Sequence, residues 1–313
     1  MTNTKCLYCY EALQEPEKDF HAKCSKIFFG SSVPPTLDVN LPDIEKLALN
    51  ILGRSTSVTG VQPKLSVDVK KNKKGPVRLT IVGLWGRYIL KPPHNAYPQM
   101  PEIEDLTMKL AEAVGIKTAD HSLIRMKSGE LAYISKRFDR TAKEKLHVED
   151  FAQLLEVLTE RKYSGSIEQI GKSILKYSSF PGNDLINLFE LILFSFLTGN
   201  ADMHLKNFSL IRDEYDDVKL SPAYDLISTK LLIPNDSEES ALSINGKKNK
   251  INRKDFDYLA DKFGVHIKTK NSIYQECAEA LNDWKDLIDK SFLSVDKQMK
   301  YKKLIEERVS QLI

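Results

Sequence analysis

A long apolar run that ends in a dense polar stretch limits what this chain can fold into. The run "LFELILFSFL" covers residues 188–197, and "TGNADMHLKNFSL" follows at residues 198–210. Because the run contains Glu190 and is too short to span a bilayer, it predicts a helix buried in a protein core. Polar groups at the end of a buried helix cost free energy unless they form hydrogen bonds or bind a ligand. We therefore interpret the polar stretch as the edge of a functional site.

Composition excludes several classes of protein. The 313 residues are enough for two packed lobes with a sizeable core, and the 42% hydrophobic and 28% charged residues are typical of a soluble globular protein. The net charge of +3 does not require a nucleic-acid partner. The first residues have no apolar segment of the secretory kind, so we expect a cytoplasmic protein with no membrane partner. Its four cysteines are then reduced or metal-bound.

Residues 1–30 form a small unit with the spacing C-x2-C-x11-H-x2-C. Two close pairs of soft or borderline ligands are what tetrahedral Zn²⁺ requires, so this segment is a candidate zinc site. An alternative stays open, in which the residues pack a short N-terminal motif without metal. The four candidate ligands are Cys6, Cys9, His21 and Cys24.

Residues 31–146 have the pattern of a small, mixed α/β lobe. A Pro-containing linker at 31–42 precedes a predicted short helix, and alternating apolar residues then predict strands. Apolar residues at helical spacing follow, and after them comes a hairpin that turns at Ser128-Gly129. The predicted elements are a helix over 44–53, a strand that ends near 69, strands over 77–83 and 86–93, a helix over 101–116, and the hairpin over 119–140.

From His147 to residue 313 the pattern changes to helices. An α/β lobe followed by a helical lobe predicts an α+β fold with a cleft between the lobes, where a ligand is expected to bind. The predicted helices cover 147–158, 167–178, 183–199, 253–264, 270–292 and 295–313.

Two features of the first lobe are consistent with phosphate binding. The loop from Gly53 to Lys64 is rich in Gly, Ser and Thr, although with two glycines it matches neither common nucleotide-binding loop. Lys91 ends the predicted strand "RYILK", the position from which a lysine pairs with nucleotide phosphates in protein kinases. Each alone is equally compatible with a surface turn and a solvated lysine.

Two features of the second lobe add carboxylate and amide groups. Asp202 and Asn207 have the spacing of the kinase catalytic loop, in which Asp accepts the substrate hydroxyl proton and Asn binds Mg²⁺. The HRD triplet of that loop is absent, and both residues could instead bond local backbone. Segments 208–212 and 218–220 predict a hairpin that brings Asn207 close to Asp225, a second oxygen ligand for Mg²⁺. The order of loop, lysine, helix acid, Asp-x4-Asn and Asp indicates a kinase-like site.

Several motifs resemble the HipA family of serine/threonine kinase toxins. They are "STSVTGVQPKLSV" (55–67), "YILKPP" (88–93), "PEIEDLTMKLAEAVGI" (101–116), "KRFDR" (136–140), "HVEDFAQLL" (147–155), "GNADMHLKNFSL" (199–210) and "LSPAYDLIST" (220–229). The resemblance implies a bilobal, protein-kinase-like fold with a mixed α/β N-lobe and an all-helical C-lobe.

The resemblance also implies roles for individual residues. Asp202 matches the catalytic base, and Asn207 and Asp225 match the Mg²⁺ ligands. Residues on the loops and strand ends match the ATP site, although family members often have Glu at position 136. The implied ATP-binding residues are Thr59, Gly60, Val61, Gln62, Pro63, Lys64, Lys91, Lys136, Phe138, His204, Lys206, Asn207, Tyr224 and Asp225.

Family members autophosphorylate a serine of the Gly-rich loop and are thereby inactivated. Ser57 aligns with that serine and Ser55 is a second candidate, which resembles the short HipT-type branch with two loop serines. A loop phosphate adds nearly two negative charges beside the nucleotide, so repulsion explains inhibition.

The chain is also shorter than HipA and has the Cys/His segment where HipA has an extra N-terminal subdomain. The resemblance therefore implies a small antitoxin protein equivalent to that subdomain and a helix-turn-helix antitoxin that alone contacts DNA. The expected substrate is an aminoacyl-tRNA synthetase, in the HipT-type branch the tryptophanyl enzyme. The main alternative function is a non-catalytic scaffold or repressor subunit in a DNA-bound antitoxin complex, and a small-molecule kinase is a third.

Overall fold

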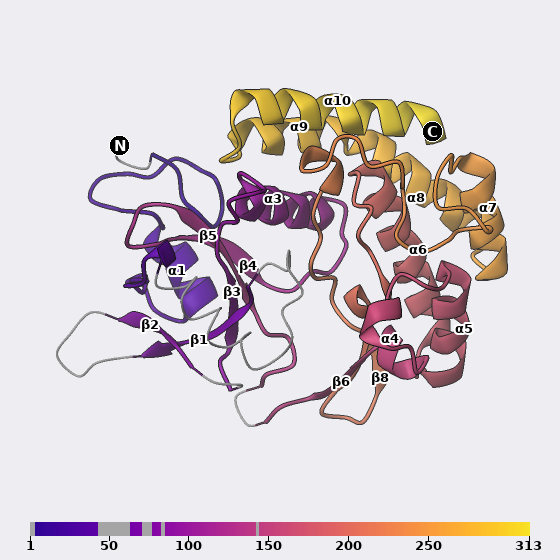
Figure 1. The fold of residues 1–313 in the computed structure, drawn as a ribbon, viewed down its shortest axis with the longest axis horizontal. Helices are drawn as coiled ribbons and strands as arrows, with labels where there is room; N and C mark the ends of the chain where they lie inside the picture. The colour runs from indigo at the N-terminus through magenta and orange to yellow at the C-terminus, as the bar shows by residue number, and fades with distance from the viewer. Residues whose placement is uncertain (1–3, 43–62, 71–76, 83–84, 142–143) are drawn as a thin grey trace. The chain divides into compact units, whose positions relative to one another are not determined.

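The computed structural model describes residues 4–42, 63–70, 77–82, 85–141 and 144–313 (Figure 1). Within it the chain forms two compact units. The first contains Met1–Asp105, Ala119–Arg137 and Lys290–Phe292, and the second contains Leu106–Thr118, Phe138–Asp289 and Leu293–Ile313. No helix in the described part of the chain is long and apolar enough to cross a bilayer.

The first unit is built on a five-stranded antiparallel sheet of order β2-β1-β3-β5-β4. Alternate residues of its strands face a core, as in β1, where Leu65 and Val67 are buried and their neighbours are partly exposed. The predicted hairpin is confirmed, because β4 and β5 pair in register on either side of the Ser128-Gly129 turn. The strands are β1 (Leu65–Lys70), β2 (Arg78–Ile81), β3 (Tyr88–Lys91), β4 (His121–Arg125) and β5 (Leu131–Lys136).

Two helices accompany this sheet. Helix α1 (Ala22–Phe29) contributes Phe28 and Phe29 to the same buried core as the strands, and it ends at Gly30, whose φ of 74° is left-handed (Figure 1). Helix α3 (Met100–Ala113) confirms the predicted helix over 101–116. Its first residues belong to the first unit and its later residues to the second.

The second unit is mainly helical and is centred on α6 (Pro181–Leu197), the helix that contains the apolar run. From Leu191 to Leu197 every residue of α6 is buried, as expected for a helix that is apolar on all sides. Phe194 packs edge-on against Trp284 with ring centroids 5.9 Å apart. The other helices are α4 (Phe151–Leu154), α5 (Ile167–Tyr177), α7 (Arg253–Lys262), α8 (Ile267–Glu279), α9 (Leu281–Lys290) and α10 (Val295–Leu312), with 3-10 turns at Thr159–Arg161, Leu205–Asn207 and Thr229–Leu231.

A second, three-stranded sheet of order β6-β7-β8 lies within this helical unit. It contains the predicted hairpin, because β7 (Ser209–Arg212) and β8 (Val218–Leu220) pair antiparallel. β6 (His147–Asp150) pairs with the other edge of β7. The predicted α+β fold is confirmed, with this small sheet as an addition to the helical part.

Two predicted helices have different bounds in the structure. The helix predicted over 147–158 is wrong at both ends, because residues 147–150 pair with β7 and the helix ends at Leu154. Helix α4 begins only after Asp150, whose carboxylate accepts a hydrogen bond from the Gln153 amide in a capping box. The helix predicted over 270–292 is two helices, α8 and α9, with a break at Ala280. The helix predicted over 44–53 lies outside the described residues.

Candidate active site

The backbone conformation at the C-terminal end of α6 determines how the polar stretch 198–210 leaves the helix. Gly199 has a φ of 70°, a left-handed conformation that ends the helix. A Cβ atom at this position would lie 2.7 Å from Cδ2 of Leu304, so only glycine fits there without a shift. The Asn200 amide still donates to the Ser195 carbonyl at 2.8 Å, which holds the first loop residue against the helix. The loop that follows therefore leaves α6 along a fixed path.

Asp202 and Asn207 are connected by the loop itself. The side-chain amide Nδ2 of Asn207 donates to the backbone carbonyl of Asp202 at 2.9 Å. This bond closes the five-residue spacing and orients the Asn207 Oδ1 atom, the one that can bind a cation. The carboxylate of Asp202 accepts a hydrogen bond from the Tyr163 hydroxyl at 2.7 Å. Both side chains are therefore held in place by contacts within the second unit.

The charges of two aspartates, Asp202 and Asp225, act on the His204 imidazole. Burial lowers the pKa of His204, and the charges of Asp202 and Asp225 only partly oppose this. Both carboxylates act on the same imidazole and favour its protonated form, but burial outweighs them and favours the neutral form. Among the described residues, its buried Nδ1 atom has no hydrogen-bond partner. An atom of this kind is available to a ligand.

Asp225 follows the β7–β8 hairpin. It has a φ of 56°, a left-handed conformation that Asp tolerates better than most residues. The preceding Tyr224 is fixed by its hydroxyl, which donates to the Lys206 carbonyl at 2.9 Å and lies 2.6 Å from Ser209 Oγ. The contact between Tyr224 and Lys206 ties the Asp225 segment to the loop of Asp202 and Asn207.

Lys91 is the predicted ATP-binding lysine of the first unit, and the structure gives it a partner. Its ammonium group forms a buried ion pair with Glu104 of α3, and it lies 5.2 Å from the ring centroid of Tyr133. The sequence predicted an acid on this helix, and the structure identifies it as Glu104. A buried lysine costs several kcal/mol unless it is paired. The pair therefore fixes the position of the Lys91 side chain.

The remaining predicted ATP-binding residues have varied surroundings. Lys206 is partly exposed and pairs with Asp150 at 3.2 Å. Lys136, at the end of β5, pairs with Asp120 at 3.2 Å. Phe138 packs against Tyr224 with ring centroids 5.5 Å apart, and Pro63 and Lys64 directly precede β1. The predicted residues Ser55, Ser57, Thr59, Gly60, Val61 and Gln62 lie outside the described residues.

Tyr163 is the residue of this site that the sequence did not reveal. Burial and the hydrogen bond to Asp202 raise the pKa of the Tyr163 hydroxyl, so it remains a donor at neutral pH. Its ring also packs edge-on against His204 at 5.1 Å. No local signal could have found it, because 39 residues separate it from Asp202.

The four candidate zinc ligands are brought together by the fold. One ligand atom from each of Cys6, Cys9, His21 and Cys24 lies within 4.8 Å of every other. All four cysteines of the chain, including the distant Cys277, are free thiols.

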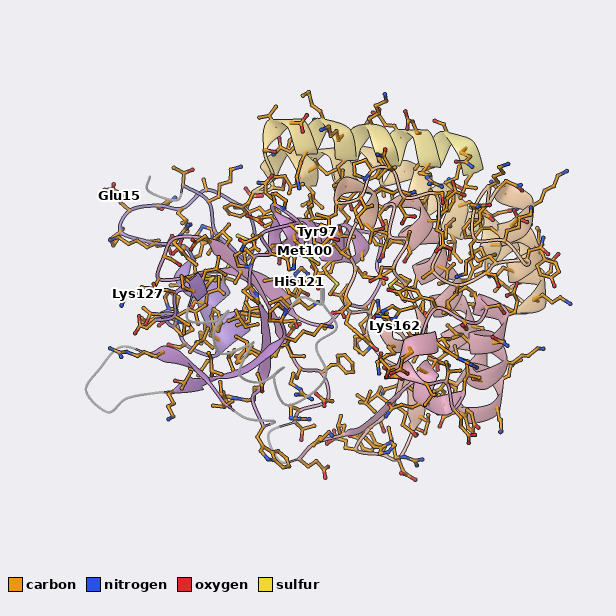
Figure 2. All side chains as sticks on the ribbon, in the orientation of Figure 1. Glu15, Tyr97, Met100, His121, Lys127 and Lys162 are labelled. Atoms are coloured by element: carbon orange, nitrogen blue, oxygen red, sulfur yellow. The ribbon has the colours of Figure 1, made fainter. Side chains whose placement is uncertain are left out.

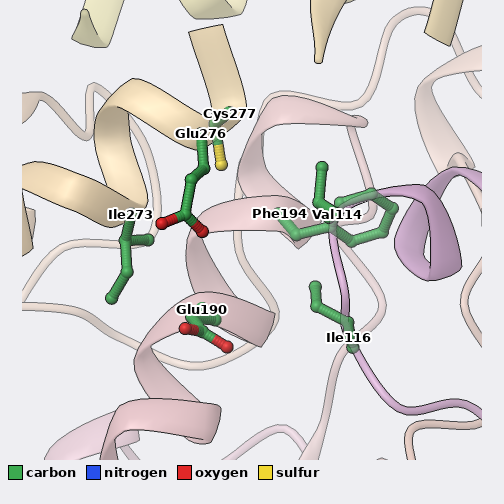
Figure 3. Close-up of a pocket in the computed structure, with 7 residues that line it drawn as sticks. All are labelled: Val114, Ile116, Glu190, Phe194, Ile273, Glu276 and Cys277. Carbon is green, nitrogen blue, oxygen red and sulfur yellow. The ribbon is translucent and has the colours of Figure 1, made fainter. Parts of the chain in front are cut away.

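A small hollow elsewhere in the second unit does not contain any predicted site residue. Its lining is largely apolar but includes Glu190 of α6 and Glu276 of α8, whose carboxyl groups lie on the same side of it (Figure 3). Burial, with a smaller contribution from the Glu276 charge, raises the pKa of Glu190. This hollow is separate in residue content from the candidate active site.

Comparison with known proteins places the chain in a family. The sequence profile described as HipA-like C-terminal domain matches residues 56–285, so the chain belongs to that family. Relatives provisionally named as kinases include Y4dM of Sinorhizobium fredii, 34% identical over 233 residues, which are 71% of this chain and 54% of that protein. A relative with the same provisional name in Haemophilus influenzae is 31% identical over 184 residues, 55% of this chain and 52% of that protein. The chain spans about half the length of these curated relatives.

Solved structures agree on the fold. HipA of Shewanella oneidensis, crystallised with HipB and its operator DNA, covers 82% of this chain with a TM-score of 0.67 and 22% identity, and the match covers 65% of that HipA chain. The proinflammatory kinase CtkA of Helicobacter pylori covers 72% of this chain with a TM-score of 0.53 and 18% identity, over 86% of its own length. The chain therefore has the α+β fold of these two proteins.

Proposed function

We propose that the chain is an ATP- and Mg²⁺-dependent protein serine/threonine kinase. The observation that carries this proposal is the buried ion pair between Lys91 and Glu104. A strand lysine paired with a helix glutamate is a working part of protein kinases, where it holds the nucleotide phosphates. Together with the Asp202 loop, the pair supplies each kind of group that phosphoryl transfer requires.

The described residues have chemistry that suits the nucleotide and the metal. Asn207 Oδ1 and the Asp225 carboxylate are hard oxygen donors of the kind Mg²⁺ prefers, and the buried Nδ1 of His204 is available to a ligand. Bound Mg²⁺ would neutralise charge on the phosphates of ATP. Asp202, oriented by Tyr163, would accept the proton of the substrate hydroxyl at its carboxylate.

The proposal extends to a toxin of the HipT-type branch. The two loop serines, Ser55 and Ser57, are the proposed sites of autophosphorylation and self-inactivation. The proposed substrate is an aminoacyl-tRNA synthetase, such as the tryptophanyl enzyme, and its phosphorylation would inhibit translation and growth. The proposed partners are a small antitoxin and a helix-turn-helix antitoxin. The support is the family membership and the association of the similar HipA structure with HipB and operator DNA.

Labelled ATP and Mg²⁺ added to the purified protein test this function. We expect incorporation of phosphate, mapped by mass spectrometry to the peptide with Ser55 and Ser57, and growth arrest when the protein is expressed alone. Asp202→Asn should lose transfer about 10³-fold. The control Asp216→Asn removes a carboxylate with 81% side-chain exposure and should leave transfer unchanged. Absence of transfer in the wild type, or equal transfer in Asp202→Asn, would favour the scaffold alternative.

A further inference from the structure

The Cys6–Cys24 segment has the geometry of a metal site. Nδ1 of His21 lies 3.3 Å from the Cys9 sulfur and 3.7 Å from the Cys24 sulfur. Tetrahedral Zn²⁺ with thiolate and imidazole ligands places neighbouring ligand atoms about 3.5–3.8 Å apart. The two separations from His21 are close to these values, and all four ligand atoms lie within 4.8 Å of one another, so small side-chain adjustments would let one ion bind at the centre.

The His21 ring is already oriented for this role. Its Nε2 atom lies 2.9 Å from the carbonyl oxygen of Ala12, to which the protonated Nε2 donates. The lone pair of Nδ1 is then directed toward the sulfur atoms. Metal-binding histidines are commonly fixed by such a second hydrogen bond, so this contact is an independent sign of a built ligand set.

The backbone around Cys6 and Cys9 is held in a defined turn by hydrogen bonds. Tyr10 N–H donates to the Cys6 carbonyl at 2.9 Å, and the Cys6 amide donates to the Glu11 carbonyl at 2.8 Å, which closes a tight turn around Cys9. Tyr10 has a φ of 66°, a left-handed conformation that a bulky residue adopts only where its surroundings require it. The turn therefore directs the Tyr10 side chain along one path.

The Tyr10 side chain reaches α3, the helix that contains Glu104. The Tyr10 hydroxyl donates to Asp105 Oδ2 at 2.6 Å, and Nδ1 of His121, labelled in Figure 2, lies 2.7 Å from Asp105 Oδ1. All three side chains are almost fully buried. Asp105 directly follows Glu104, the partner of Lys91. The cysteine turn is thus connected to the start of α3 through one hydrogen bond.

We propose that Cys6, Cys9, His21 and Cys24 bind one Zn²⁺ ion and that the metal-bound turn positions the Lys91–Glu104 pair through Tyr10 and Asp105. Three thiolates and one imidazole match the ligand preference of zinc. The zinc site itself does not depend on the enzymatic activity. Its positioning role rests on the proposed kinase function.

Metal analysis of the full chain, purified without added metal, tests the site. We expect about one zinc ion per chain in the wild type and about a tenth of that in Cys24→Ser. Cys277→Ser changes the free thiol outside the cluster and should keep the full zinc content. Reconstitution with Co²⁺ should give thiolate-to-cobalt charge-transfer absorption. A wild type without zinc and without this absorption would overturn the proposal, whether or not the protein is a kinase.

Tyr10→Phe tests the positioning role, because it removes the hydroxyl and keeps all four ligands. We expect full zinc content, faster hydrogen exchange in peptides covering 100–113, and a KM for ATP raised about tenfold. A mere loss of folded protein would lower kcat and leave KM unchanged. The control Tyr8→Phe, in the same turn but packed on Phe28, should behave as the wild type. Unchanged exchange and unchanged KM in zinc-loaded Tyr10→Phe would refute the positioning role, and the exchange measurement needs no activity.

Discussion

At the scale of single residues, the site depends on charges held away from water. The side chains of Lys91 and Glu104 are 5% and 2% exposed, so neither charge could be left alone without a large cost. The Asp202 carboxylate is held differently, by a neutral donor from Tyr163. Buried ion pairs and neutral hydrogen bonds respond differently to mutation, and each gives a prediction.

Lys91→Met should destabilise the fold as well as abolish phosphate binding. It leaves the Glu104 carboxylate buried without its counter-charge, so we expect a loss of about 3 kcal/mol in the free energy of unfolding. Lys136→Met breaks an exposed pair with Asp120 and should cost less than about 1 kcal/mol. Urea denaturation measures both. Equal losses in the two variants would contradict the assignment of Lys91 to a buried pair.

Tyr163→Phe should slow transfer without weakening nucleotide binding. Removal of the hydroxyl frees the Asp202 carboxylate to rotate, which matters only when it accepts the proton. We expect kcat to fall about tenfold and KM for ATP to stay within about twofold. Steady-state kinetics measure this, with Tyr215→Phe, an 80% exposed tyrosine, as control. An unchanged kcat would show that Tyr163 has no role in orienting Asp202.

At the scale of elements, helix α6 is largely buried, and substitutions at Gly199 just after its end and at Glu190 in its middle should have measurable effects. Its end at Gly199 directs the candidate catalytic loop, and Glu190 in its middle lies in a largely apolar hollow beside α8 (Figure 3). The first position is sensitive to added volume and backbone strain. The second is sensitive to protonation.

Gly199→Ala should destabilise the end of α6. The left-handed backbone and the 2.7 Å approach of Leu304 both oppose a Cβ atom, so we expect a loss of about 2–3 kcal/mol in unfolding free energy. Gly182→Ala, near the start of the same helix, meets no atom within 4 Å and should be neutral or slightly stabilising. Thermal unfolding compares the two, and equal midpoints would refute the steric account.

Glu190→Gln should change how stability depends on pH. Because the folded-state pKa of Glu190 is raised, folding favours its protonated form, and the wild type loses stability as pH rises through that value. Glutamine cannot ionise, so the variant should gain roughly 2 °C in unfolding midpoint relative to the wild type between pH 4.5 and pH 8. Calorimetry at the two pH values measures the difference. A constant difference between variant and wild type would contradict it.

At the scale of the whole molecule, the sequence predicted what depends on local periodicity and spacing. Residue pattern alone found most helices, the β4–β5 and β7–β8 hairpins, and the Cys/His cluster, because neighbours in sequence determine them. The residues it missed are fixed by distant contacts. The local pattern predicts a helix at β6, because its strand partner β7 is far along the chain. Tyr163 and Tyr10 act through hydrogen bonds that no spacing rule predicts.

The β6–β7–β8 sheet also determines when the candidate catalytic loop acquires its shape during folding. β6 pairs with β7 only after α4, α5 and α6 have been synthesised, since all three lie between them in the chain. Tyr224 and Thr229, which bond the Lys206 carbonyl and the Ala201 amide, come later still. A nascent chain that has emerged only as far as Asn207 contains the whole "NADMHLKN" segment without its framework. Under the proposed kinase function, the chain therefore cannot act on its substrate until synthesis has passed Tyr224 and Thr229.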